Sequence, residues 1–81
     1  MRFCYLCGGV PSDTHHIFNG AERKKSEQYG AIIQVCRRCH NEIHKNYPLR
    51  EQLKKEFQHK IMVEHNLTID EFREIFKKNY L

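Results

Sequence analysis

The chain has 81 residues, of which 14 are lysine or arginine and 10 are aspartate or glutamate, so its formal net charge is +4 at pH 7. This length permits one small domain and excludes separate catalytic and regulatory domains. Folding at this size buries only roughly 60% of the extended surface, so a metal, a disulfide or a partner must support the small core. The four cysteines and six histidines are candidate metal ligands, and the positive charge favours a polyanionic partner.

The N-terminal segment from Met1 to Cys7 lacks a long apolar run and a small-residue cleavage site. We therefore expect no targeting signal, and we expect a cytoplasmic protein. No stretch of the sequence reaches membrane-spanning length, so no membrane association is expected. In a reducing compartment, paired cysteines are more often metal ligands than disulfides.

Two cysteine pairs, Cys4-x-x-Cys7 and Cys36-x-x-Cys39, have the spacing of a closed four-sulfur zinc site. The 28 residues between Cys7 and Cys36 exceed the usual 15 to 20, so this segment is predicted to be an insertion with its own purpose. The alternatives for these cysteines are four free thiols or a redox pair.

The insertion contains Asp13 and the consecutive residues His15 and His16. Neighbouring side chains of an extended strand point to opposite faces, so one histidine could bind a metal while the other meets a substrate. A neutral imidazole can also accept a proton from water near neutral pH. The alternative is a pair of surface histidines, and Asp13 could either accept a hydrogen bond from a ligand histidine or belong to a turn.

Five basic residues could contact phosphate groups, with solvated loop residues as the alternative interpretation. They form two groups, one within the insertion and one between the cysteines of the second pair: Arg23, Lys24, Lys25 and Arg37, Arg38. Their pattern gives no basis for reading a base sequence.

A helix is predicted to begin near Cys39 and to carry His40 and His44 on one face, because these residues are four apart. Cys39 and His40 are adjacent, and successive helical side chains point roughly 100° apart. The two residues should therefore serve different metal ions. The alternative is that the histidines are exposed or that one replaces a cysteine at the zinc.

Residues 48–81 contain neither glycine nor cysteine and are predicted to form two helices. Pro48 suits a first helical turn, and Thr68 with Glu71 forms a capping-box pattern after a break near Asn66. We expect the apolar stripes of both helices to pack against the first half of the chain: Leu49, Leu53, Phe57, Ile61 and Ile69, Phe72, Ile75, Phe76.

The ordered motifs Cys-x-x-Cys, His-His-Ile and Cys-x-x-Cys-His-x-x-x-His, over residues 4–46, resemble the HNH nucleases of the ββα-metal, treble-clef type. The similarity is greatest to small phage- and prophage-encoded members with a four-cysteine structural zinc. The resemblance implies a small α+β zinc-stapled domain covering residues 1–81. Its ββα-metal core would occupy residues 1–47, and two C-terminal helices would follow in residues 48–81.

The resemblance further implies that the four cysteines hold Zn²⁺, that His16 is the general base, and that a catalytic Mg²⁺, Mn²⁺, Ni²⁺ or Zn²⁺ ion is held by His15, His40 and His44. The implied reaction is hydrolysis of DNA.

The asparagine that orients the general base in this family would align near Ala31, where this chain has no asparagine. Asn19, Gln34 or a backbone carbonyl could replace it. The alternative function is a DNA- or protein-binding module that does not cut, and the C-terminal helices could bind a second copy or a phage protein.

Overall fold

The architecture is a small two-stranded sheet combined with four helices. The computed structural model describes residues 3–81, so Met1 and Arg2 of the predicted core lie outside the described residues. In chain order the elements are β1 (Asp13–His16), the 3-10 turn η1 (Gly20–Glu22), α1 (Arg23–Gln28), β2 (Ile32–Val35), α2 (Arg37–Lys45), α3 (Tyr47–His65) and α4 (Ile69–Phe76).

The two strands are antiparallel, and their register decides which side chains face the helices. His15 lies opposite Ile33, and both residues are buried. Because side chains alternate along a strand, Asp13 shares the face of His15, whereas His16 belongs to the other face. The sheet therefore presents the two histidines to different surroundings.

Side chains at the helix starts explain where α2 and α3 begin. The Cys36 sulfur accepts a hydrogen bond from the Cys39 backbone N–H (3.5 Å), so α2 begins at Arg37, two residues earlier than predicted. The Asn46 side chain accepts a hydrogen bond from the Leu49 N–H (3.1 Å) at the start of α3. Pro48 lies in the first turn of α3, where its missing N–H costs no helical hydrogen bond, as predicted.

The predicted capping box at the start of α4 is confirmed. Thr68 accepts a hydrogen bond from the Glu71 N–H (3.2 Å), and the Glu71 carboxylate accepts one from the Thr68 N–H (2.9 Å). Phe72 and Phe76 are buried. The prediction that Ile69 packs against the core is wrong, because this residue is 44% exposed. Ile69 is the first residue of α4 and lies outside the part of the helix that packs against the core.

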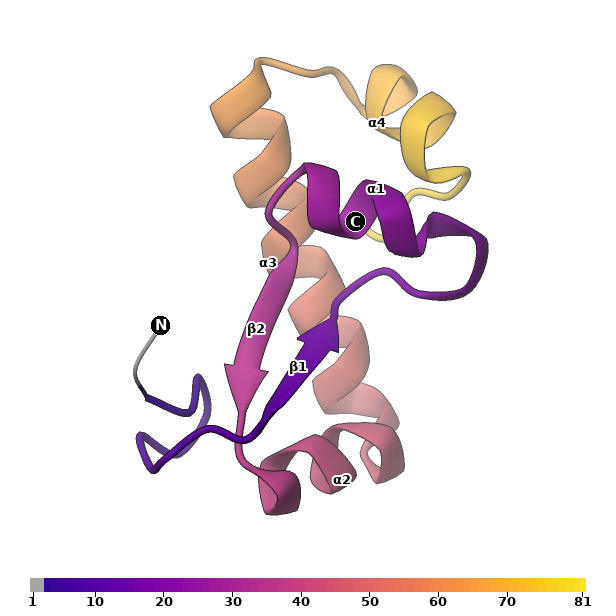
Figure 1. Ribbon diagram of the computed structural model, residues 1–81. Coiled ribbons are helices and arrows are strands. Elements are labelled where there is room, and N and C mark those ends of the chain that lie inside the picture. Colours follow the sequence, from indigo (N-terminus) through magenta and orange to yellow (C-terminus); the bar gives the residue numbers. More distant parts are fainter. Residues whose placement is uncertain (1–2) are drawn as a thin grey trace.

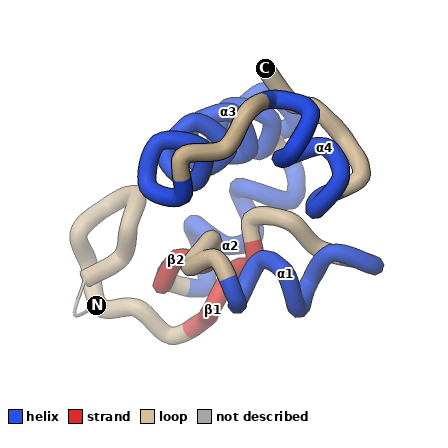
Figure 2. Tube along the Cα trace, turned by 90° about the horizontal axis from the view of Figure 1, so that it is seen from above, coloured by secondary structure: helices blue, strands red, loops and turns tan. Residues whose placement is uncertain are grey.

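The helices α3 and α4 form a layer on one side of the hairpin, with α3 across the strands and α4 beside α1 (Figure 1 and Figure 2). Figure 1 shows α3 running behind both strands, from α2 at one end of the hairpin towards α1 and α4 at the other. Figure 2 shows α3 and α4 on one side of the strands and of α1. Phe18, two residues beyond β1, packs its ring against Phe72, Phe76 and Tyr80, at centroid distances of 5.8, 4.7 and 5.2 Å. This aromatic cluster joins the hairpin to the C-terminal helices, as predicted for their apolar stripes.

Within residues 3–81, every helix is too short or too polar to cross a bilayer.

We expect Phe72→Ala to lower the free energy of unfolding by about 3–5 kcal/mol, because it removes a fully buried ring from the aromatic cluster. Urea denaturation of the metal-loaded protein measures this change. Ile69→Ala, on the same helix, is the matched control and should cost less than about 1 kcal/mol. Equal losses in the two variants would contradict this description of the core.

Candidate metal centre and histidine pocket

The four cysteines form one cluster that could hold a metal ion. Their sulfur atoms all lie within 4.8 Å of one another, and the Sγ atoms of Cys7 and Cys36 are 3.8 Å apart. Four sulfurs at about 2.3 Å from a tetrahedral zinc ion would be about 3.8 Å from each other. The cluster therefore fits the size and ligand type of a zinc ion.

Backbone geometry around Cys4 and Cys7 places the first cysteine pair. The Cys4 N–H donates to the Gly9 carbonyl (2.7 Å), and the Gly8 N–H donates to the Cys4 carbonyl (2.9 Å). Gly8 has a φ of 78°, a conformation that glycine adopts without steric cost. The Gly9 N–H then points at the Cys7 sulfur (3.4 Å), so the turn directs N–H groups towards the sulfurs.

The electrostatics of this cluster favour a bound cation. Burial raises the pKa of Cys4, but hydrogen bonds from the backbones of Cys7, Cys36 and Leu6 and from the Cys7 side chain together outweigh burial and lower the pKa to about 6. Burial and the neighbouring sulfurs raise the pKa of Cys39 to about 12. Four thiolates this close would repel one another, and a divalent ion is the charge that could hold them together.

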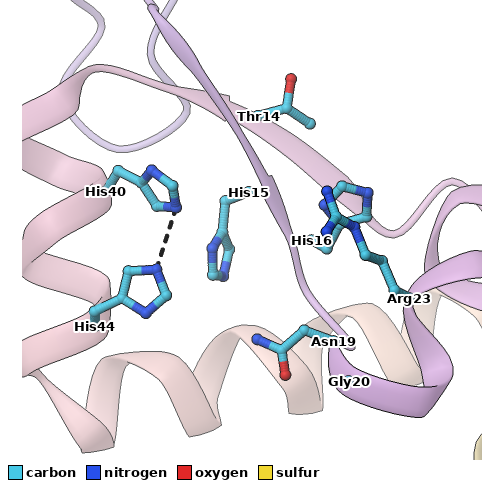
Figure 3. A pocket seen from close by; sticks show the side chains of 8 residues that line it. All are labelled: Thr14, His15, His16, Asn19, Gly20, Arg23, His40 and His44. Atoms are coloured by element: carbon cyan, nitrogen blue, oxygen red, sulfur yellow. Dashed lines mark hydrogen bonds between the residues drawn. The ribbon is translucent and has the colours of Figure 1, made fainter.

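His15, His40 and His44 form a second cluster that could hold a metal ion. One ring nitrogen from each lies within 4.8 Å of the others, and the Nε2 atoms of His40 and His44 are 3.2 Å apart. Two nitrogens bound to one tetrahedral ion at about 2.0–2.1 Å would be separated by about 3.3–3.4 Å. Figure 3 shows the His15 ring from β1 pointing towards the two rings from α2.

Asp13 fixes one of these rings. Its Oδ2 atom accepts a hydrogen bond from His40 Nδ1 (2.9 Å) and one from Arg37 Nε (3.0 Å). The hydrogen bond from His40 is the main reason that the pKa of Asp13 lies below its usual value. A carboxylate on the far nitrogen leaves His40 Nε2 available to bind a metal ion. Of the two expectations for Asp13, the structure shows the hydrogen bond with a candidate ligand histidine.

His15 is the buried member of the triad, with 3% of its surface exposed. Burial, followed by the charges that His40 and His44 can carry, lowers its pKa from 6.5 to about 4. The ring is therefore neutral at pH 7, which is the form that binds metals.

His16 lies beside the triad but is held differently. Figure 3 shows its ring on the other side of the strand from the His15 ring. All four histidines line one pocket of about 230 Å³, together with Thr14, Asn19, Gly20 and Arg23. The His16 Nε2 atom lies 2.7 Å from the Glu27 carboxylate of α1. This hydrogen bond is the main reason that the pKa of Glu27 lies below its usual value.

The five predicted phosphate-binding residues do not lie together. Arg23 lines the histidine pocket, whereas Lys24 and Lys25 line a second depression, between α1 and α4. Arg37 pairs with Asp13. The Cys7 sulfur is the main influence that raises the pKa of the Arg38 guanidinium, which therefore belongs to the cysteine end of the domain.

Glu27 is the residue that sequence reasoning missed at this pocket. Asn19 lines the pocket, but Gln34 accepts a hydrogen bond from Thr14 (3.1 Å), and the partner of His16 is Glu27. Glu27 belongs to no motif, and the unusual length of the insertion was its only signal.

Comparisons with protein-family models, with curated proteins and with solved structures found no match for this chain.

We expect the protein to bind two divalent ions per chain, one at each cluster. His44→Ala removes one triad ligand and should reduce the content to one ion without loss of fold, as measured by elemental analysis and circular dichroism. His59→Ala, at an exposed position of α3, is the control and should keep two. A content of one ion in all three proteins would show that the triad holds none.

We expect the buried His15 ring to make stability depend on pH when the triad is free of metal. Between pH 6.5 and pH 4, the unfolded chain binds a proton at His15 that the folded chain does not, so stability falls as pH falls through this range. The parent should lose up to about 3 kcal/mol more than His15→Gln over this range, as measured by urea denaturation. Both proteins keep the cysteine site, so the stability that each loses when the cysteines are protonated cancels in the comparison. An equal loss of stability in the two proteins over this pH range would contradict the low pKa of His15.

Proposed function

We propose that this protein is a metal-dependent HNH endonuclease that hydrolyses DNA phosphodiester bonds. In this proposal the cysteine cluster holds a structural Zn²⁺, and His15, His40 and His44 hold one catalytic divalent ion. The observation that carries it is that the metal-binding triad and a fourth histidine, His16, open onto the same pocket. A site that only stabilised the fold would have no need of an open pocket.

The order of the elements supports assignment to the ββα-metal, treble-clef type. The ligands come from the turn before β1, from β1 itself and from both ends of α2, and α1 is inserted between the strands. In this proposal β1, β2 and α2 are the ββα unit, and α3 with α4 is the C-terminal extension that supports it.

The proposed reaction uses water as the nucleophile. A bound divalent ion supplies Lewis-acid stabilisation of the negative charge that develops on the phosphate. His16 removes a proton from the water as its oxygen bonds to phosphorus. The bond from phosphorus to the 3′ oxygen then breaks, leaving a 5′-phosphate and a 3′ hydroxyl that takes its proton from solvent.

Charge around the pocket supports a nucleic-acid substrate. Arg23 at the start of α1 faces the same pocket as the four histidines, and a guanidinium there would bind a phosphate oxygen. Lys24 and Lys25 continue the positive charge along α1 towards α4. Contacts of this kind bind the DNA backbone without reading bases, so we expect little sequence specificity.

The cytoplasmic location of the protein stays a prediction. The binding of a second copy or of a phage protein at the C-terminal helices also stays a prediction.

A second candidate is a zinc-stapled DNA- or protein-binding module that does not cut. It is favoured by Ala31, a fully buried apolar residue near the position where the HNH family has an orienting asparagine. In such a module the triad would bind a metal without turnover.

We expect the parent to nick supercoiled plasmid in the presence of Mg²⁺, Mn²⁺ or Ni²⁺. His16→Ala should lower the rate by roughly 100-fold or more, because it removes the proposed base, while the metal content stays at two ions. His59→Ala should cut like the parent. Equal nicking by parent and His16→Ala, or no nicking by the parent with any of these ions, would overturn the nuclease proposal.

A further inference from the structure

We propose that Glu27 is a positioning residue that holds the His16 imidazole in the orientation required of a general base, a role that rests on the proposed nuclease function. Glu27 would thereby replace the orienting asparagine that the chain lacks near Ala31. The carboxylate comes from α1, the helix inserted between the two strands. This role gives the long insertion a purpose in the reaction.

The contact itself assigns different tasks to the two ring nitrogens. Glu27 Oε1 lies 2.7 Å from His16 Nε2, within the range of a charge-assisted hydrogen bond. An ionised carboxylate can only accept, so whenever the His16 ring is neutral its one N–H is on Nε2 in this contact. The lone pair is then on Nδ1, which is the atom left to take a proton from water. The His16 side chain is only 11% exposed, so its neighbours restrict the ring.

Hydrogen bonds of the adjacent residue fix the position of Glu27. The buried Ser26 hydroxyl donates to the Ala31 carbonyl and accepts from the Phe18 N–H (3.2 Å). The Ala31 N–H donates to the Ser26 carbonyl (2.7 Å). These bonds tie α1 to the end of β1 and to the start of β2. Glu27 therefore reaches His16 from an anchored backbone rather than from a free loop.

The residues that might otherwise orient His16 have different contacts or no suitable group. Gln34 is hydrogen-bonded to Thr14, and Ala31 has no polar side chain. The backbone carbonyl of Ala31 already accepts from the Ile17 N–H (3.0 Å) and from Ser26. Asn19 lines the same pocket, but the side-chain partner of His16 is Glu27. Glu27 is thus the side chain placed to orient the ring.

A purely electrostatic role for Glu27 predicts the opposite effect on the reaction. The Glu27 side chain is 58% exposed, and a negative charge beside the pocket repels the phosphates of DNA. Removing the charge alone would strengthen DNA binding and leave kcat unchanged. Removing a positioning contact lowers kcat instead, so the two roles are separated by measuring kcat and KM.

The test compares four proteins on a short duplex with Mn²⁺: the parent, Glu27→Ala, Glu27→Asp and Glu22→Gln. Glu27→Ala removes the acceptor and should lower kcat roughly 10- to 100-fold, as expected for loss of a group that orients a functional histidine, with KM unchanged or reduced. Glu27→Asp keeps a carboxylate on a shorter arm and should have an intermediate kcat. Glu22→Gln removes an equal charge from η1 and should keep the parent kcat.

A second measurement does not depend on cleavage. Long-range proton–nitrogen NMR correlations at one fixed pH identify which ring nitrogen of His16 carries the proton. We expect Nε2 in the parent and in Glu22→Gln, and a loss of that preference in Glu27→Ala, which has no acceptor at this position.

The outcomes separate the two proposals. If the parent and Glu27→Ala cut with the same kcat, the role of Glu27 is overturned and the nuclease stands. If His16 keeps the same tautomer preference in the parent and in Glu27→Ala, the orienting contact is overturned whatever the activity. If the parent does not cut with any ion but the preference is lost in Glu27→Ala, the nuclease is overturned while the contact is supported.

Discussion

Cys39 and His40 are consecutive residues of α2, and the angle between successive helical side chains sends them to two different clusters. Cys36 caps the same helix through its sulfur and also belongs to the cysteine cluster. The start of α2 therefore positions the sulfurs of Cys36 and Cys39, and the residues that follow position the imidazoles of His40 and His44. Any change in the rotation or start of α2 would move both clusters together, so the histidine pocket depends on correct formation of the cysteine site.

The small core explains why this coupling is useful. An 81-residue chain has little apolar surface to bury, and much of its core lies between the hairpin and the layer of α3 and α4 (Figure 2). The N-terminal turn that carries Cys4 buries no large apolar side chain among residues 3–10, since Phe3, Tyr5, Leu6 and Val10 are all exposed, and Tyr5 only packs its ring against Phe57 at 6.1 Å. A metal ion bound by four sulfurs would attach this turn to β2 and α2.

Sequence reasoning succeeded where the signal was local. Spacing within the cysteine pairs, the interval between His40 and His44, and the capping box at Thr68 each depend on a few consecutive residues, and the structure brings the expected groups together. Glu27 could not be predicted, because it meets His16 only after Ser26 has anchored α1 to the sheet. Ile69 follows the helical period but is exposed, since periodicity does not say where the covered surface ends.

The central claim is that this chain holds two metal ions in two chemically different clusters set by one helix. Crystals grown with zinc and soaked in Mn²⁺, with anomalous scattering recorded at the zinc and manganese edges, test it most directly. We expect a zinc peak among the sulfurs of Cys4, Cys7, Cys36 and Cys39, and a separate manganese peak among the rings of His15, His40 and His44. A single zinc peak with no ion at the histidines, or one ion shared between cysteine and histidine ligands, would contradict it.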